Sequence, residues 1–494
     1  MKNLTRRNFI KGSLASAATA GVASQLLTSN VWAQARGAND DIRVAVVGIG
    51  NKGRQHVREL LKHQGVRLVA VSDADTERME KRALKYAREA NQNVQPIQDF
   101  RRILDDKSID AIVTATPNHW HALVTIWACQ AGKDVYVEKP VSHNVWEGKK
   151  MIEAARKYNR IVQSGTQLRS DTGLRQVIPY IQQGNLGKIK LAHCLCYNYR
   201  GSIGKVAGPQ PIPATVDYNL WCGPAPLEPL RRKKLHYDWH WVWSTGNGDL
   251  VNQAIHDMDL CRWAIGEDQF PSEVTSIAGR FGYDDDGETP NTQVAFLKYD
   301  KVPIVYVMQG LGREKGSKSL NAYKGVRTGI VIECENGYFA GGKGGGWVYD
   351  NNDKKVKQFI GDGGKGHHAN FFKAMRSRKV SDLNADVREG YLSSCLCHLA
   401  CIPDRVGALT TVEKIKESIS SEHPEVGVRF EEFQKHLAAN EVDLTKVNAR
   451  LGPKLKIDQK AETYIGAAKY NDSYWANQLL ARTYREPFVV RDQV

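Results

Sequence analysis

Long apolar runs, Cys-x-x-Cys pairs and basic clusters are all missing from this chain. Beyond the N-terminus no run of about 18 uninterrupted apolar residues occurs, so we expect no membrane-spanning helix. None of the nine cysteines stands in a Cys-x-x-Cys spacing, and no metal site is predicted. The odd number of cysteines, several of them in apolar stretches, predicts small core residues rather than a disulfide framework.

The charge balance is basic, yet it does not identify a nucleic-acid-binding protein. The formal net charge is +15 over 494 residues, and the lysines and arginines are scattered along the chain. Without a long basic run or a nucleic-acid-binding motif, we expect no nucleic-acid partner. The length and a hydrophobic content of 41% are sufficient for a large core and predict two or three domains.

The first 33 residues have the features of an export signal. Arg6 and Arg7 lie in a basic head, residues 12–27 are modestly apolar and rich in Ala, Ser and Gly, and a small-residue cleavage motif ends at Ala33. The paired arginines resemble the twin-arginine (Tat) signal, whose pathway exports folded proteins. No cysteine stands at the cleavage site, so we expect no lipid anchor. We therefore predict a periplasmic protein that engages the Tat machinery and loses residues 1–33.

The next segment carries a dinucleotide-binding pattern. A β-branched strand, 42–47, leads into the fingerprint Gly48-x-Gly50-x-x-Gly53, followed by a helical pattern and a second strand, 66–71. In this fingerprint the first glycine allows the tight turn, the second lets the backbone approach the pyrophosphate, and the third lets helix and strand pack closely. The helix N-terminus, with Asn51 and Lys52, offers its positive dipole to the phosphates.

Asp73 stands 20 residues beyond Gly53, where an acidic side chain binds the ribose hydroxyls of a dinucleotide. Its charge would repel a 2′-phosphate, so we predict NAD rather than NADP. Strands and helices continue to alternate through 109–115 and 134–137, which predicts a parallel, doubly wound sheet with ligands at the strand carboxyl ends. The polar motifs at these ends are candidate cofactor contacts: Thr116, Pro117, Asn118, His121, Glu138 and Lys139.

Together these motifs resemble the glucose–fructose oxidoreductase / inositol dehydrogenase / MocA (Gfo/Idh/MocA) family. The matching residues are the glycine fingerprint, the run 116–121, Glu138-Lys139-Pro140, Gly165-Thr166-Gln167 and His256. The resemblance implies an α/β chain: a Rossmann domain followed by an α+β domain whose open, mostly antiparallel sheet faces the nicotinamide. It adds Gln167 to the cofactor contacts, implies a Lys–Pro bond that is often cis, and suggests a homo-oligomer by analogy.

We expect the chain to be organised in four parts. Residues 1–33 are the signal peptide, 41–165 the NAD-binding Rossmann domain, and 166–410 the α+β substrate and oligomerisation domain. Residues 411–494 carry alternating helical and polar segments and are interpreted as a C-terminal elaboration of the second domain.

The resemblance also implies catalytic roles. Lys139 would lie beside the nicotinamide and the reacting hydroxyl, where an ammonium stabilises a developing alkoxide and can pass a proton. His256 would be the general base. Asn252 stands four residues before it, on the same face of one predicted helix, and replaces an Asp found in many family members. An amide cannot raise the histidine's basicity by charge, but it can orient substrate. Asp249 is a helix cap or a substrate contact.

The stretch 237–243 concentrates aromatic residues just before this motif. Alternation on a strand would put Trp239, Trp241 and Trp243 on one face and His240 on the other. Such a face suits sugar C–H surfaces, and His240 suits hydroxyls, but core aromatics in a sheet explain the pattern equally well. In a loop that lines a pocket, these residues would pack as core aromatics and also contact the substrate.

We expect an exported NAD-dependent oxidoreductase that transfers hydride between tightly bound NAD and a CH–OH group of a sugar, glycoside or cyclitol. In one alternative, a redox-assisted glycosidase or lyase, oxidation of one sugar carbon acidifies the neighbouring C–H, permits elimination and is then reversed. In the other, a non-catalytic sugar-binding relative keeps only the fold; intact Lys139 and His256 argue against it.

Overall fold

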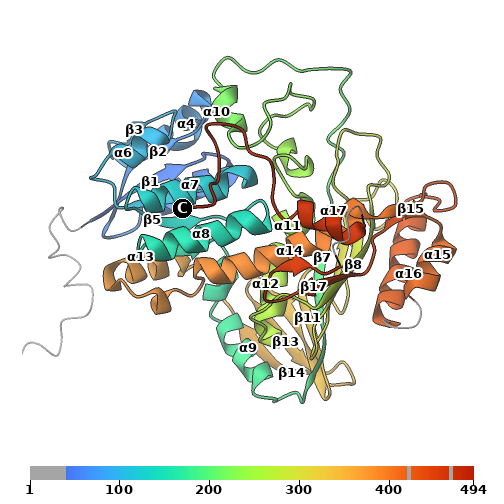
Figure 1. Ribbon diagram of the computed structural model, residues 1–494. Helices are drawn as coiled ribbons and strands as arrows, with labels where there is room; N and C mark the ends of the chain where they lie inside the picture. Colours follow the sequence, from blue (N-terminus) through green and yellow to red (C-terminus); the bar gives the residue numbers. More distant parts are fainter. Residues whose placement is uncertain (1–40, 420–423, 467–470) are drawn as a thin grey trace, which may run out of the picture.

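The computed structural model describes residues 41–419, 424–466 and 471–494, so the predicted signal peptide lies outside the described residues. Two sheets of different character organise these residues, one formed by the first part of the chain and one by the rest (Figure 1). Within the described ranges, no helix combines the length and apolarity needed to cross a membrane.

The first sheet has six strands, all parallel, in the order β3-β2-β1-β4-β5-β6. This is the strand order of a Rossmann fold, with the reversal between β1 and β4. The central strands are buried on both faces, as their continuous apolar runs predict. The strands are β1 (Ile42–Val47), β2 (Val66–Ser72), β3 (Gln95–Pro96), β4 (Ala111–Thr114), β5 (Asp134–Val137) and β6 (Val162–Ser164).

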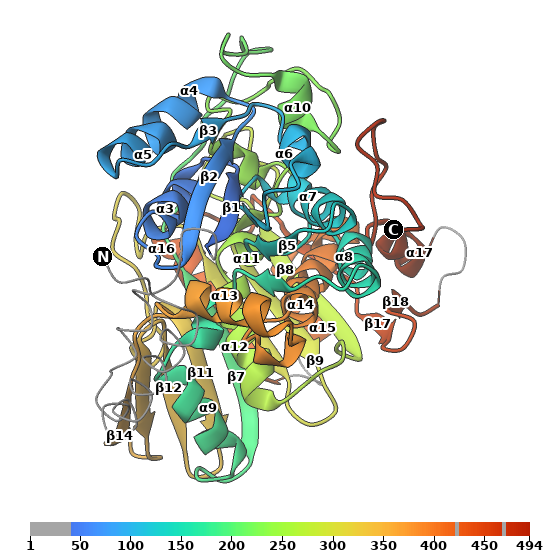
Figure 2. The same cartoon turned by 90° about the vertical axis from the view of Figure 1, so that its left-hand side faces the viewer.

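Helices cover both faces of this sheet. Those from the first part of the chain are α3 (Asn51–Leu60), α4 (Thr76–Met79), α5 (Lys85–Glu89), α6 (Arg101–Asp105), α7 (Asn118–Gln130) and α8 (Val145–Lys157). Another covering helix, α13 (His367–Ser377), comes from much later in the chain. Its Phe371 and Phe372 are fully buried in the same hydrophobic cluster as β1 and α3. Figure 2 shows α13, in orange, beneath the first sheet and close to α3.

The second sheet has twelve strands and is mostly antiparallel; β7 and β10 form a parallel pair. Its main path runs β14-β13-β12-β11-β7-β10-β9-β8-β16-β15. The strands are β7 (Ile189–Tyr197), β8 (Glu273–Gly279), β9 (Thr292–Lys298), β10 (Ile304–Gln309), β11 (Thr328–Cys334), β12 (Gly337–Gly342), β13 (Gly345–Tyr349), β14 (Lys355–Ile360), β15 (Ala408–Thr410), β16 (Ala449–Leu451), β17 (Leu455–Asp458) and β18 (Thr463–Tyr464).

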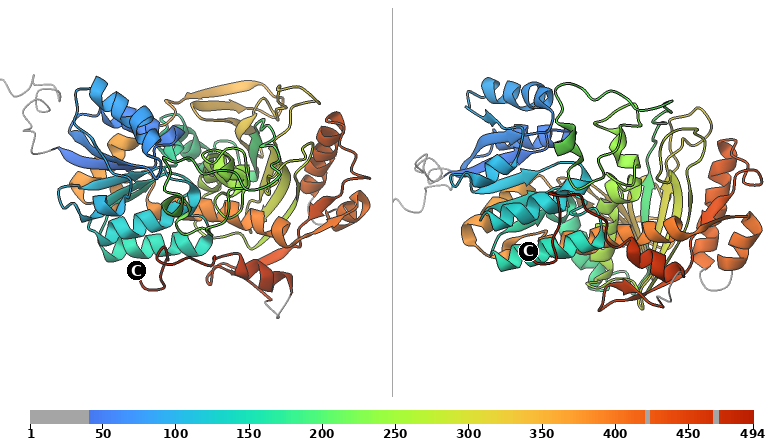
Figure 3. Two further views of the ribbon diagram at one scale, coloured as in Figure 1. Left: turned by 90° about the horizontal axis from the view of Figure 1, so that it is seen from above. Right: turned by 45° about the horizontal axis from the view of Figure 1, so that its top comes forward.

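Helices pack on this sheet from the side of the first domain and from the opposite side. The remaining α-helices of the described ranges are α9 (Leu174–Gln182), α11 (Gly248–Asn252), α12 (Ile255–Ile265), α14 (Val387–Val406), α15 (Val412–Ile419), α16 (Pro424–Ala439), α17 (Asp472–Gln478) and α10 (Tyr218–Cys222). Of these, α10 lies against α7 of the first domain, where Trp120 donates to the carbonyl of Leu220. Figure 3 shows α15 and α16, in red, at the end of the molecule farthest from the first sheet. Strands β15 and β16 extend the second sheet, and β17 pairs with β8, so the first part of the C-terminal segment is built onto it. The last residues of the chain contact the first domain, where Lys150 of α8 donates to the carbonyl of Asp492.

The predicted fold class is confirmed: a parallel Rossmann sheet is followed by an α+β part with an open, mostly antiparallel sheet. All nine cysteines are free and buried, as their apolar surroundings predict. A long irregular segment, 198–247, links β7 to α11 and reaches back to the first domain, where the backbone N–H of Thr76 donates to the carbonyl of Thr215. This segment supplies one wall of the site described next.

Candidate active site

The glycine turn between β1 and α3 has the geometry that its three glycines require. Gly48 has φ +87°, and a Cβ there would lie 2.5 Å from the backbone nitrogen of Thr116. A Cβ on Gly53 would lie 1.8 Å from the carbonyl oxygen of Gly48, so only glycine lets the helix pack this closely. At Gly50 the nearest atom would be 3.6 Å away, on Arg78. The backbone at Gly50 is thus open to a ligand at the start of α3.

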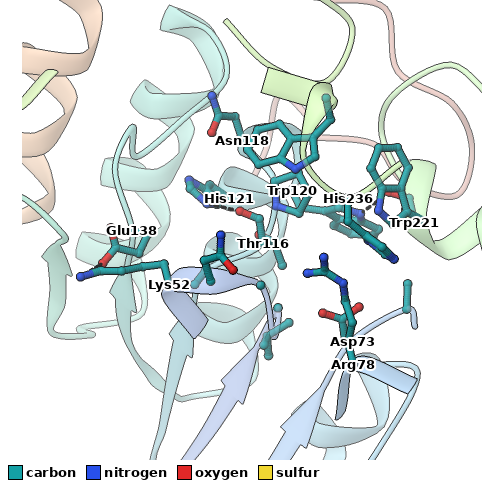
Figure 4. A pocket seen from close by; sticks show the side chains of 18 of the residues that line it. Lys52, Asp73, Arg78, Thr116, Asn118, Trp120, His121, Glu138, Trp221 and His236 are labelled. Carbon is teal, nitrogen blue, oxygen red and sulfur yellow. Dashed lines mark hydrogen bonds and ion pairs between the residues drawn. The ribbon is translucent and has the colours of Figure 1, made fainter. Parts of the chain in front are cut away.

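This turn opens into a cavity of about 470 Å³ that lies between the first sheet and the segment 198–256. Most of the predicted site residues line it: Gly48, Gly50, Asn51, Lys52, Asp73, Thr116, Pro117, Asn118, His121, Glu138, Lys139, Gln167, Trp239, His240, Asn252 and His256. Gly53, Trp241 and Asp249 are not part of the lining. Figure 4 shows Lys52 beside Glu138 at one end of the cavity and Arg78 beside Asp73 at the other.

Asp73 stands just beyond β2 and anchors the glycine turn. Its carboxylate accepts hydrogen bonds from the backbone nitrogens of Ile49, at 2.6 Å, and Asp75, at 3.0 Å. Burial raises the pKa of Asp73, and these hydrogen bonds oppose that rise. Each carboxylate oxygen has a further lone pair, so Asp73 can still accept from a ribose hydroxyl.

Glu138 is the most heavily paired acid of the cavity. Its Oε1 accepts from Gln167 at 2.8 Å and from His56 at 3.0 Å, and lies 3.6 Å from Nζ of Lys52. Burial alone would raise the pKa of Glu138, but the charge of Lys52 and the hydrogen bond from His56 outweigh it. The pKa therefore lies well below the usual value, and the side chain is ionised.

Lys139 points from the end of β5 toward the second domain. The Lys139–Pro140 peptide is cis, as the family resemblance implies. Nζ of Lys139 donates to the backbone carbonyl oxygen of Asn252 at 2.5 Å. Burial lowers the pKa of Lys139, and the nearby Glu138 carboxylate opposes this. A lysine whose ammonium form is destabilised gives up its proton more readily than an exposed one.

The prediction that Asn252 and His256 share one helix is wrong. Helix α11 ends at Asn252 and α12 begins at Ile255, because the backbone nitrogens of Gln253 and Ala254 both bond to the carbonyl of Asp249. The N–H of His256 bonds to Gln253, which leaves the Asn252 carbonyl for Lys139. Both side chains nevertheless line the same cavity.

His256 lines this cavity, and one of its ring nitrogens, the buried Nδ1, has no hydrogen-bond partner among the described residues. Burial, followed by the charge of Lys139, lowers the pKa of His256 to about 3, so the ring is neutral at neutral pH. A neutral imidazole with a free nitrogen can accept a hydrogen bond or a proton from a substrate hydroxyl.

Two other predicted contacts brace the cavity wall. His121 lies between two backbone carbonyls, with Nε2 2.8 Å from that of Thr116 and Nδ1 2.5 Å from that of Pro140. Asn118 donates to Asn247 at 3.1 Å across the domain boundary. These contacts connect the β4 and β5 loops to each other and to the segment before α11.

The aromatic stretch does not form a strand with alternating faces but follows the other alternative, a non-strand segment that lines a pocket. Residues Asp238–Trp241 form a 3-10 turn in which Trp239 stacks on His240, with ring centroids 3.7 Å apart. Both residues line the cavity, whereas Trp241 is buried. Asp249 is also buried, and its Oδ2 accepts from Nε of Arg200 at 2.7 Å.

Several lining residues were missed at the sequence level. They are Arg78, Arg82, Gln98, Trp221, His236 and Tyr237. Arg78 and Arg82 stand four residues apart, in the helical segment that follows Asp73, and this spacing could have indicated them. The last three come from the irregular segment 198–247, where no periodic pattern predicts which side chains reach the cavity.

The residues present fit a dinucleotide: an open backbone at Gly50, a helix N-terminus, a carboxylate at the end of β2, and hydrogen-bonding groups along β4 and β5. Comparisons with known proteins agree. Residues 42–166 match the NAD-binding Rossmann fold of an oxidoreductase family, and residues 174–426 match its C-terminal alpha/beta domain. Residues 3–23 match the signal sequence of the twin-arginine translocation pathway.

Among curated proteins, inositol 2-dehydrogenase of Salmonella typhimurium is 31% identical over 181 residues, which is 36% of this chain and 52% of the relative. The scyllo-inositol 2-dehydrogenase (NAD(+)) of Bacillus subtilis is 26% identical over 239 residues, 48% of this chain and 56% of the relative. The chain thus spans about half the length of the curated relatives it matches.

Solved structures show the same fold at low identity. The WlbA dehydrogenase from Bordetella pertussis, in complex with NADH and UDP-GlcNAcA, has a TM-score of 0.54 at 21% identity, covering 73% of this chain and 95% of that one. A levoglucosan dehydrogenase in complex with NADH has a TM-score of 0.54 at 18% identity, covering 73% and 96%. From the two matched domains, the site and the fold, we conclude that this chain belongs to the Gfo/Idh/MocA family of NAD-binding oxidoreductases.

Proposed function

We propose that the protein is an exported oxidoreductase that transfers hydride between tightly bound NAD and a CH–OH group of a sugar, glycoside or cyclitol. The observation that carries this proposal is the meeting of Lys139, Asn252 and His256 in the cavity that begins at the glycine turn. The dinucleotide fingerprint and the acid–base residues thus belong to one site rather than two.

The roles of the residues follow from their charge states. When bound, NAD would accept the hydride from the substrate carbon. The neutral ring of His256, which lines the cavity, accepts the hydroxyl proton, and the Lys139 ammonium stabilises the developing alkoxide. Asn252, Trp239 and His240 orient the substrate. Asp249 acts less directly, through its ion pair with Arg200.

The cofactor would lie along the first sheet. The pyrophosphate would be surrounded by Gly48, Gly50, Asn51 and Lys52, and the ribose would donate to Asp73. The rest of the cofactor would contact Thr116, Pro117, Asn118, Glu138, Lys139 and Gln167. Gly53 and His121 act as positioning residues, because the first packs under the turn and the second connects two loops.

The proposal for substrate class rests on two supports. Several relatives have names that describe inositol dehydrogenases. The stacked Trp239 and His240 present an aromatic face with an adjacent polar nitrogen, an arrangement suited to a polyol ring. We also propose periplasmic export by the Tat machinery, a homo-oligomer, and the four-part division of the chain at residues 33, 165 and 410.

Product analysis with a panel of free sugars, glycosides and cyclitols tests this function. Purified protein loaded with NAD is mixed with each compound, and NADH, oxidised product and cleaved product are scored separately. Stoichiometric oxidised product supports the proposal. Cleaved sugar without net NADH would support the redox-assisted lyase instead, and binding without hydride transfer to any compound would support a non-catalytic relative.

A further inference from the structure

Four ionisable side chains form an unbroken hydrogen-bonded row that ends at the proposed active site. Oε2 of Glu59 lies 3.0 Å from Nδ1 of His368. Nε2 of His368 lies 2.9 Å from Nδ1 of His56, and Nε2 of His56 lies 3.0 Å from Oε1 of Glu138. Helix α3 supplies the first and third members, α13 supplies His368, and Glu138 follows β5.

The row runs from solvent into the protein. The side chain of Glu59 is 45% exposed and that of His368 is 12% exposed, whereas those of His56 and Glu138 are 0% and 4% exposed. Glu138 lines the large cavity, but the other three residues do not. One end of the row therefore contacts bulk water on the outer surface of α3 and α13, and the other end contacts the site.

Counting donors and acceptors fixes where the protons are. Glu138 is ionised and can only accept, so Nε2 of His56 carries a hydrogen. Burial lowers the pKa of His56 to about 4, so its ring is neutral and its Nδ1 is a bare acceptor. His368 must then donate from Nε2 to His56. It must also donate from Nδ1 to Glu59, and is therefore an imidazolium.

Glu59 supplies the countercharge for this imidazolium. Burial raises the pKa of Glu59, but the hydrogen bonds from His368 and Gln55 outweigh it and lower the pKa to about 2. The row is thus ordered as carboxylate, imidazolium, imidazole and carboxylate. Every hydrogen bond donates in the same direction from His368 inward, which is the arrangement that a stepwise proton transfer needs.

We propose that Glu59, His368, His56 and Glu138 form a proton path between the surface and the active site; this inference rests on the proposed function. As the proton on Nε2 of His368 moves to Nδ1 of His56, the hydrogen on Nε2 of His56 moves to Oε1 of Glu138. Glu138, which lines the cavity, then releases this proton into the site. Both imidazole rings must turn before His368 can take a new proton from water at the Glu59 end and the starting hydrogen positions are restored. Ketone reduction consumes one proton by this route, and alcohol oxidation returns one by the reverse sequence.

Such a path has a use only if bound substrate and cofactor occupy the cavity. Hydride transfer from an alcohol leaves one proton behind, and it must leave the site before the next turnover. The backbone N–H of Lys139 donates to Oε2 of Glu138 at 3.3 Å, so the inner end of the path is next to the residue that contacts the reacting hydroxyl in the proposed function.

The same residues include a candidate metal cluster of His56, Glu59 and His368, with ligand atoms within 4.8 Å of one another. The hydrogen-bond geometry favours the proton path. Glu59 faces Nδ1 of His368, and His56 faces Nε2 on the other side of the same ring. The His368 imidazole therefore lies between the other two side chains, and the three do not point at one shared metal position.

The charged and titratable groups that interact with the row include Lys52 and Lys139 near Glu138, His63 and His367 near His368, and Tyr136. Among these, His63 gives a matched control. It lies at the same interface and packs edge-on against Phe372 of α13, but it is not a member of the row.

The protonation states can be tested without any substrate. Nitrogen-15 NMR of the histidine rings at neutral pH should show His56 neutral with hydrogen on Nε2 only, and His368 with hydrogen on both nitrogens. Glu59→Gln removes the countercharge, and His368 should then become neutral while His63→Gln leaves it unchanged. A neutral His368 in the parent protein, or hydrogen on Nδ1 of His56, would overturn the path.

Transport itself is tested by turnover. In His368→Ala, steady-state turnover should fall by roughly 10-fold or more, less than the loss of a direct acid–base group, while NAD binding is unchanged. Added imidazole should restore part of the rate and the solvent deuterium isotope effect should rise, whereas His63→Gln should do neither. Unchanged turnover in His368→Ala, or a loss that imidazole does not relieve, would contradict transport.

Two further outcomes separate this inference from others. If the parent protein transfers hydride to no compound, the proposed function fails, and the NMR result still decides the proton positions. If the purified protein contains one metal ion per chain that is lost in both His56→Ala and His368→Ala, the cluster is a metal site and the proton path is wrong.

Discussion

Lys139 donates a hydrogen bond from Nζ to the backbone carbonyl oxygen of Asn252, 2.5 Å away. In a continuous helix this carbonyl would accept from the N–H of His256, but the break between α11 and α12 redirects that N–H to Gln253. The interrupted helix therefore holds Lys139 of one domain against the α11–α12 segment of the other. This contact places Lys139, Asn252 and His256 in one cavity.

Replacing Lys139 with Ala should strongly slow hydride transfer while NAD still binds. Loss of a positioned cation that stabilises an alkoxide costs about 10²–10³-fold in rate. Single-turnover NADH formation measures the chemical step, and quenching of protein fluorescence measures NAD binding. Lys139→Arg, which keeps the charge but cannot release a proton at neutral pH, separates the two roles. Near-parental rates in Lys139→Ala would remove this residue from the mechanism.

His256→Ala should lower the rate on the order of 10²–10⁴-fold, the usual range for a general base. Restoring an acid with Asn252→Asp should raise the pKa of His256 from about 3, because a carboxylate favours the charged ring. A base must be deprotonated to act, so the acid limb of the pH–rate profile should move to higher pH. A profile that does not move in Asn252→Asp would show that these two side chains do not interact.

Asp73 should make the protein bind NAD more tightly than NADP. In Asp73→Ala the difference between the two affinities should become smaller. The arginines Arg78 and Arg82 line the same end of the cavity, so removing the carboxylate leaves a positive pocket beside the ribose. Dissociation constants for both dinucleotides, measured for the parent and for Asp73→Ala, test this prediction. Equal affinity of the parent protein for NAD and NADP would refute the role of Asp73.

Local sequence patterns predicted most of the first domain, because a strand, a glycine turn and a helix are encoded by adjacent residues. The parallel topology also predicted that the polar residues at the ends of β4 and β5 would line one cavity. The break after Asn252 and the 3-10 turn at Trp239 had no such signal, since tertiary contacts decide them. The pairing of His56 with His368 joins residues 312 positions apart and depends on α13 returning to the first sheet. No local pattern contains that information.

Export should depend on the paired arginines. Arg6→Lys combined with Arg7→Lys keeps the charge and removes the feature that distinguishes the Tat signal. We expect precursor to accumulate in the cytoplasm, as measured by cell fractionation and immunoblotting. A Lys2→Arg substitution, which alters the basic head without changing the pair, is the matched control. Unchanged periplasmic accumulation of the double variant would argue against Tat export.

If the protein is exported as proposed, we predict that NAD is loaded before export and retained. Outside the cytoplasm little free dinucleotide is available for exchange, so an enzyme that released NADH after each turnover would stall. Retained cofactor must be regenerated in place, either by a second substrate that accepts the hydride or by a redox-neutral cycle on one sugar.

The most direct test of this account is to purify the mature protein from the periplasm without added cofactor, denature it and quantify the released dinucleotide. We predict near-stoichiometric NAD(H), together with turnover that needs no added cofactor. A cofactor-free protein that works only with excess NAD would contradict the account and indicate a conventional dehydrogenase.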